Sequence, residues 1–238
     1  MTNNRPKIYA HRGASVDFPE HTLAAYQAAI EQGADGFECD VRLTKDSIPI
    51  LWHDSTMDRT AGAHGDIAAL SYIQIRDRYP QVVLFTEYLE LAIANKKDVA
   101  IETKHPVPTG REIERVIEKE LDGYRSEIEK SGIEVSIMSF SWTAIENVTR
   151  NLNLNTVMLV DGIKGRYLEN FSSAKTLGPS IQSIKKRSQI ITVAKKRGKR
   201  LFIWTVDDPK DVEFCALNDI DVVITNKPAQ ARKVLGYP

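Results

Sequence analysis

Acidic residues at alternate positions recur in the apolar segments of the first half of the chain. Glu38 and Asp40 lie in the segment GFECDV, and Glu102 lies in the segment AIETK, two positions before Lys104. Alternate residues of a β-strand point to the same face, so Glu38 and Asp40 project together, as do Glu102 and Lys104. If these strands are parallel neighbours, the groups converge at one end of a sheet, where α/β enzymes place their active sites.

Three carboxylates at one site would repel one another unless positive charge compensates them. Lys104 and Arg12 supply part of that charge, and a divalent cation with oxygen ligands would supply the rest. Mg²⁺ or Ca²⁺ is the predicted ion, because an all-carboxylate set lacks the nitrogen and sulfur ligands that zinc prefers. An edge strand with solvated acids would give a similar pattern, but the apolar neighbours of these acids favour a metal site.

Two histidines stand at matching positions beside the predicted metal site. His11 closes the apolar segment 7–10 and is followed by Arg12, and His53 closes the segment 48–53. Histidine titrates in the range needed for general acid and base catalysis, and the planar donors of arginine suit a phosphate. A single histidine at a strand end is more often structural. The presence of His53 at a position that matches His11 favours a catalytic pair. Together these residues predict metal-assisted phosphoryl chemistry.

Short apolar segments alternate with longer amphipathic segments along the whole chain. This alternation predicts a parallel sheet with helices packed outside it, in one domain spanning 1–238. Nine strand candidates exceed the eight places of a barrel, and the connection between Val41 and Ile48 is too short for a crossover helix. The expected strands are 7–10, 36–41, 48–53, 98–103, 133–139, 155–160, 176–182, 200–206 and 221–225, and the expected helices are 21–32, 86–96, 110–131, 141–152, 187–197 and 208–218.

The composition excludes several classes of protein. With 238 residues, 42% hydrophobic and 27% charged, the chain is typical of an ordinary globular protein. Thirty-two basic and 32 acidic residues leave no net charge to attract nucleic acid or an anionic membrane. The two cysteines form no disulfide framework or metal motif, and no apolar segment predicts a secretion signal or a membrane span. We expect a cytoplasmic protein without stable membrane association.

Several motifs together resemble the glycerophosphodiester phosphodiesterase family, of the phospholipase C-like phosphodiesterase superfamily. The most specific are HRGASVDFPEHT (11–22) and GADGFECDVRLTKDSIPILWHDSTMDRT (33–60). The resemblance continues through AIETK (100–104), Ser139-Phe140, FIWTV (202–206) and DVVITN (221–226), and so covers nearly the whole chain.

The resemblance implies a TIM-type (β/α)8 barrel that hydrolyses glycerophosphodiesters, such as glycerophosphocholine or glycerophosphoethanolamine, to glycerol 3-phosphate and an alcohol. It implies that His11 and His53 are the acid/base pair and that Glu38, Asp40 and Glu102 hold a divalent metal ion. It further implies that Arg12 and Lys104 contact the phosphate, and that Phe140 and Trp204 line the glycerol side of the pocket. Which histidine is the acid stays open, as does the nucleophile, which is either water or the glycerol 2-hydroxyl.

The chain departs from the family pattern at His21, where asparagine is usual. Histidine caps helices poorly, and no metal or acid/base role belongs to this position in the family, so we expect this change to affect the geometry of the local loop more than catalysis. The segment 61–85 resembles the small insertion of the family and is expected to form a cap over the barrel mouth.

Two other functions stay open from the sequence. They are a lysophospholipase D-like enzyme that acts on lipids and a non-catalytic barrel that binds phosphodiesters. The alcohol of the substrate, the choice between Mg²⁺ and Ca²⁺, and the oligomeric state are not determined by these motifs.

Overall fold

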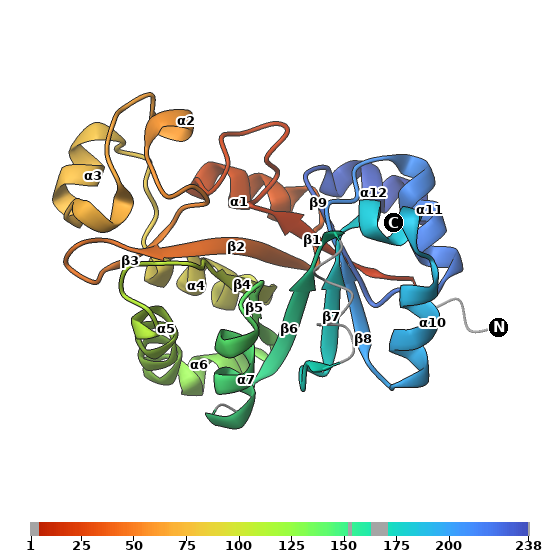
Figure 1. Ribbon diagram of the computed structural model, residues 1–238. Helices are drawn as coiled ribbons and strands as arrows, with labels where there is room; N and C mark the ends of the chain where they lie inside the picture. The colour runs from red at the N-terminus through yellow and green to blue at the C-terminus, as the bar shows by residue number, and fades with distance from the viewer. Residues whose placement is uncertain (1–4, 152–153, 163–170, 238) are drawn as a thin grey trace.

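Eight parallel strands close into a barrel in the computed structural model, which describes residues 5–151, 154–162 and 171–237 (Figure 1). The order around the barrel is β1-β9-β8-β7-β6-β5-β4-β2, and pairing of β1 with β2 completes the ring. The predicted (β/α)8 barrel is thereby confirmed. The strands are β1 (Lys7–His11), β2 (Gly36–Leu43), β4 (Asp98–Thr103), β5 (Val135–Ser139), β6 (Asn155–Val160), β7 (Thr176–Pro179), β8 (Arg200–Ile203) and β9 (Val222–Thr225).

The ninth strand candidate lies outside the barrel. Strand β3 (Pro49–Leu51) pairs antiparallel with the end of β2, with Val41 opposite Leu51. A hairpin needs only a short connection, which explains why no helix fits between these two strands. The chain then forms the helices α2 (Asp58–Ala61), η1 (Ile67–Ala69) and α3 (Tyr72–Arg78), which stand at one rim of the barrel mouth (Figure 1).

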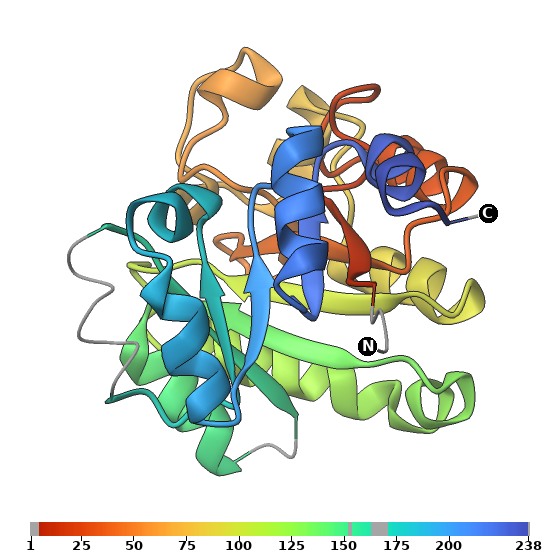
Figure 2. The same ribbon diagram turned by 90° about the vertical axis from the view of Figure 1, so that its right-hand side faces the viewer.

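The remaining helices surround the barrel, as the two views show (Figures 1 and 2). They are α1 (Leu23–Glu31), α4 (Phe85–Ala94), α5 (Glu112–Gly123), α6 (Arg125–Ser131), α7 (Trp142–Asn151), α9 (Ile181–Lys186), α10 (Gln189–Lys196), α11 (Pro209–Leu217) and α12 (Pro228–Leu235). Among the helices that the structure describes, none has both the length and the apolar character needed to cross a membrane.

Several expected elements differ in extent from the structure or are described only in part. The expected helix 110–131 divides into α5 and α6, which meet at Gly123 and Tyr124, because glycine is a poor helix former. The expected strand 176–182 ends at Pro179, and α9 begins after it because the Ser180 side chain accepts a hydrogen bond from the backbone of Ser183. Of the expected helix 141–152, residue 152 lies outside the described residues.

Apolar side chains fill the middle of the barrel, and polar side chains line its mouth. Tyr9 and Phe202 meet edge to face inside the barrel, with ring centroids 5.7 Å apart. Gly36 permits this packing, because a Cβ at that position would lie 2.7 Å from the Tyr9 ring. The polar side chains at the carboxyl ends of β1, β2 and β4 are therefore left to form a site at the mouth.

Candidate active site

Three carboxylates converge at the mouth of the barrel. Asp40 on β2 lies directly beside Glu102 on the neighbouring strand β4, and Glu38 precedes Asp40 on the same face of β2. All three side chains are buried, and one oxygen from each lies within 4.8 Å of the others. The alternation of the two strands thus brings together the acids that the sequence predicted, in an arrangement that could bind a metal ion.

The charges of these carboxylates are only partly compensated by the protein. Burial and the charge of Asp40 raise the pKa of Glu102 to about 7, and the same two causes raise the pKa of Glu38 well above its usual value. Burial also acts to raise the pKa of Asp40, but contacts with His21, Lys104 and Arg12 hold that pKa well below its usual value. A buried oxygen-only set with two carboxyls that resist ionisation suits a divalent cation such as Mg²⁺ or Ca²⁺.

Arg12 and Lys104 are held at the site by the same acids. The Nε atom of Arg12 lies 2.9 Å from Oδ2 of Asp40, and the Nζ atom of Lys104 lies 2.8 Å from Oδ1 of Asp40. Lys104 also donates a hydrogen bond to Oε1 of Glu102 at 2.8 Å. The Nη1 atom of Arg12 donates to Glu20 at 3.3 Å. Both cations are thus fixed beside the acids, where an anionic group could reach them.

His11 is oriented by residues from the far end of the sequence. Its Nδ1 lies 2.7 Å from Oδ1 of Asn226, whose Nδ2 donates to Asp207 at 2.6 Å. The amide oxygen of Asn226 can only accept, so we assign the proton to Nδ1 of His11 and leave Nε2 without one. Nε2 lies 3.8 Å from Glu38. Burial lowers the pKa of His11 to about 4, which favours the neutral ring.

His53 is oriented by its neighbour in the chain. It lies just beyond the end of β3 at Leu51, and its Nδ1 lies 2.7 Å from Oδ1 of Asp54. Asp54 is in turn held by Arg59, whose Nε donates to it at 2.6 Å. Burial lowers the pKa of His53. The charges of Arg12 and Lys104 lower it further, whereas the charge of Asp40 and the hydrogen bond to Asp54 oppose the shift. Among the described residues, the Nε2 atom of His53 has no hydrogen-bond partner.

A cavity of about 240 Å³ joins nearly all of the predicted site residues. Asp40 alone does not line it, and lies buried behind it against Arg12 and Lys104. Trp204 donates a hydrogen bond to the backbone of Gly178 at 2.7 Å, and its ring meets Phe140 edge to face at 5.6 Å. The cavity residues are His11, Arg12, Glu38, His53, Glu102, Lys104, Met138, Phe140, Leu159, Trp204, Thr205 and Ile224.

Known proteins share both this sequence pattern and this fold. The sequence profile of the glycerophosphoryl diester phosphodiesterase family matches residues 11–230. A probable glycerophosphodiester phosphodiesterase 1 of Mycobacterium tuberculosis is 30% identical over 253 residues, which cover 95% of this chain and 91% of the relative. The chain belongs to the glycerophosphoryl diester phosphodiesterase family.

Solved structures extend the similarity to the whole barrel. A glycerophosphodiester phosphodiesterase from Thermotoga maritima superposes with a TM-score of 0.82 at 24% identity, covering 97% of this chain and 98% of that chain. An Oleispira antarctica phosphodiesterase, solved in complex with the product sn-glycerol-3-phosphate, has a TM-score of 0.77 at 20% identity and covers 98% and 97%. These neighbours have the same fold, and family membership identifies the present protein as a phosphodiesterase.

His21 has a different place in this phosphodiesterase from the one that the sequence predicted. Its side chain is buried, with Nε2 2.9 Å from Oδ2 of Asp40 and Nδ1 3.0 Å from the hydroxyl of Tyr26. The helix cap is supplied by Thr22, which accepts from the backbone of Ala25. The backbone of His21 is left-handed (φ 60°), and the sequence did not indicate the contact of its ring with Asp40.

Sequence reasoning also missed the residues that support His11, the predicted acid/base residue on β1. Asn226 is the last residue of the motif DVVITN, so the sequence included it in the family resemblance but did not indicate its contact with His11. Asp207 and Ser15 both bond to Asn226, and neither carried any signal of this in the sequence. For His53 the signal was present, because Asp54 follows it directly in the chain.

Proposed function

We propose that the protein hydrolyses glycerophosphodiesters to glycerol 3-phosphate and an alcohol, with Mg²⁺ or Ca²⁺ held by Glu38, Asp40 and Glu102. The observation that carries this proposal is the convergence of these acids, at the barrel mouth, with two histidines whose Nδ1 atoms are hydrogen-bonded and whose Nε2 atoms are available for proton transfer. The names of the relatives support the substrate class, and the product bound by the Oleispira antarctica enzyme supports the product.

The acids fit a hard divalent cation because their donors are all oxygen and because two of them resist ionisation without one. When bound, such a cation would stabilise the negative charge that develops on the phosphodiester oxygens. Arg12 and Lys104 would add fixed donors for the same oxygens, since Asp40 already holds both of them in place. Phe140 and Trp204 would pack against the carbon atoms of the glycerol.

The partners of the two histidines suggest how they divide the proton transfers. Asp54 is a carboxylate, and it favours the protonated imidazolium of His53, so His53 would donate a proton to the leaving alkoxide. Asn226 is neutral and fixes the Nδ1 proton of His11, so the free Nε2 of His11 would accept the proton of the nucleophile. The nucleophile is either water or the glycerol 2-hydroxyl.

Release of glycerol 3-phosphate from glycerophosphocholine and from glycerophosphoglycerol tests this function. After treatment with EDTA we expect no release, and we expect release to return with Mg²⁺, Ca²⁺ or Mn²⁺. Release that persists without metal would refute the metal site. Faster hydrolysis of lysophospholipid than of any soluble diester would favour a lipid phosphodiesterase, and tight binding without turnover would favour a binding protein.

The contact between His21 and Asp40 leads to a prediction about metal affinity. His21→Ala removes the hydrogen bond that orients Asp40, so we expect the affinity for Mg²⁺ or Ca²⁺ to fall by about 10–100-fold in isothermal titration calorimetry. His64→Ala, at an exposed histidine of the segment 61–85, is the control and should bind the ion normally. An unchanged affinity in His21→Ala would show that the contact does not orient the metal ligand.

A further inference from the structure

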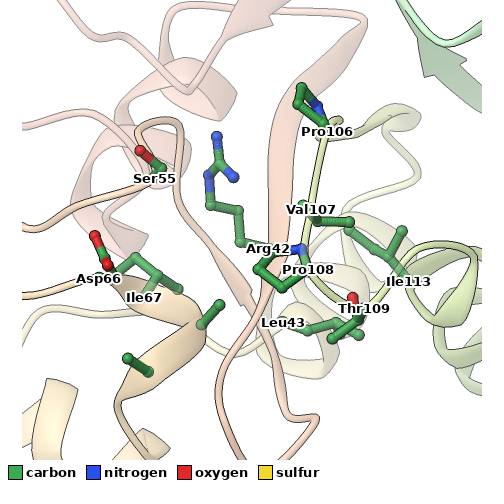
Figure 3. Close-up of a pocket in the computed structure, with 12 residues that line it drawn as sticks. Arg42, Leu43, Ser55, Asp66, Ile67, Pro106, Val107, Pro108, Thr109 and Ile113 are labelled. Atoms are coloured by element: carbon green, nitrogen blue, oxygen red, sulfur yellow. The ribbon is translucent and has the colours of Figure 1, made fainter.

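A second cavity, of about 300 Å³, lies beyond the end of β2 (Figure 3). One wall comes from Ser55 and the short helix η1, and the other comes from the loop between β4 and α5 (Figure 3). Arg42, on β2, rises between these two walls (Figure 3). None of its lining residues belongs to the lining of the catalytic cavity.

The second cavity adjoins the catalytic cavity on the side of His53. Arg42 follows Asp40 at the next inward position of β2, and its Nε donates a hydrogen bond to the backbone carbonyl of His53 at 3.0 Å. On the other wall, Pro106 follows the catalytic-cavity residue Lys104 by two positions. His53 is the proposed proton donor to the leaving group, so the second cavity lies on the leaving-group side of the proposed site.

The charge in this cavity comes mainly from Arg42. Apart from the bond to His53, its guanidinium forms no hydrogen bond or ion pair within the part of the chain that the structure describes. The one acid of the lining, Asp66, is exposed, so solvent screens its charge more strongly than that of Arg42.

The rest of the cavity is mostly apolar and would pack against carbon atoms. Its apolar walls include Leu43, Ile67, Val107, Pro108 and Ile113. A polyhydroxy alcohol matches both features, because its carbon skeleton can lie on the apolar walls while its hydroxyl oxygens accept hydrogen bonds from a guanidinium. A quaternary ammonium group has no acceptor and would be repelled by the positive charge.

We infer that this cavity receives the leaving alcohol, and that Arg42 makes the enzyme prefer diesters of polyhydroxy alcohols, such as glycerol or inositol, to those of choline. The inference rests on the proposed hydrolysis of glycerophosphodiesters. It adds a specificity-determining residue outside the metal site and the histidine pair.

The test compares kcat/KM for glycerophosphoglycerol, glycerophosphoinositol and glycerophosphocholine with the divalent ion in excess. The wild-type protein should prefer the two polyol diesters. Arg42→Gln should lower the ratio of kcat/KM for polyol diesters to that for glycerophosphocholine by about tenfold or more. Loss of a hydrogen bond to a charged group usually changes binding by this amount. Arg42→Lys keeps the charge and should keep the preference, although losing the Nε contact with His53 should slow the hydrolysis of all substrates.

Two further variants separate this effect from a general loss of activity. Arg76→Gln removes an exposed positive charge from α3, outside the cavity, and should leave the ratio unchanged. Ala68→Phe narrows the cavity and should raise KM for glycerophosphoinositol more than KM for the methyl diester of glycerol 3-phosphate, whose leaving group is too small to need the space.

Two results would overturn the inference while leaving the proposed function intact. They are a wild-type preference for glycerophosphocholine and a ratio that Arg42→Gln does not change. If no glycerophosphodiester is hydrolysed with any metal, the proposed function fails and the inference fails with it.

Discussion

Replacing His53 with alanine is expected to lower kcat by about 10²–10⁴-fold, and replacing His11 is expected to have an effect of similar size. Each histidine lines the cavity at the barrel mouth and has its Nδ1 bonded to an oxygen acceptor, so that Nε2 is the atom left to exchange a proton with the substrate. Glycerol 3-phosphate release with the ion in excess measures the loss. Near-normal turnover in either variant, with the fold and metal binding retained, would refute its acid/base role.

A substrate with a better leaving group separates the two roles. The p-nitrophenyl diester of glycerol 3-phosphate loses an anion that needs no proton, so a general acid contributes little to its hydrolysis. If His53 is the acid, His53→Ala should regain most of its activity on this substrate, whereas His11→Ala should stay impaired. The reverse pattern would exchange the two assignments. His64→Ala, at an exposed histidine outside the cavity, should behave as the wild type on both substrates.

The part of the site that the sequence predicts is the part fixed by strand alternation. Glu38 and Asp40 share a face because they are two residues apart on β2, and Glu102 joins them because β4 is the next parallel strand of the barrel. Eight of the expected strands also form the barrel, because each is a short apolar segment between amphipathic segments. Local patterns of residue type are sufficient for these features.

Other features of the site depend on contacts between distant segments of the chain. Local sequence patterns do not predict such contacts. Asn226 reaches His11 only because β9 pairs with β1 when the barrel closes. His21 reaches Asp40 through a left-handed turn in a loop, where no periodicity indicates the direction of a side chain. Arg42 follows the inward alternation of β2, but the space around it is created by two loops that no sequence pattern places.

Replacing Glu102 with glutamine is expected to remove most of the metal binding, and the activity with it. Glutamine has nearly the same shape but no charge, and its one neutral amide oxygen is a weaker ligand for a divalent cation than a carboxylate. We expect the affinity for Mg²⁺ or Ca²⁺ to fall by more than the roughly 10–100-fold typical of residues that only orient a ligand. Titration calorimetry measures this affinity directly, without relying on turnover.

Thermal unfolding provides an independent measure of the same loss. An ion present at about 100 times its dissociation constant stabilises the folded state by about 2.7 kcal/mol, so added Mg²⁺ or Ca²⁺ should raise the Tm of the wild-type protein. The Tm of Glu102→Gln should not respond at the same ion concentration. Asp40→Asn is the less direct variant, because it leaves Arg12 and Lys104 without the carboxylate that both contact, and is expected to lower stability even without the ion.

Glu127→Gln is the matched control, because it removes one exposed carboxylate from α6, outside the barrel mouth. Its ion affinity and its Tm shift should equal those of the wild-type protein. If Glu102→Gln also binds the ion as the wild type does, the three acids are not the metal site. Glu102 would then serve only to hold Lys104, whose Nζ it contacts at 2.8 Å.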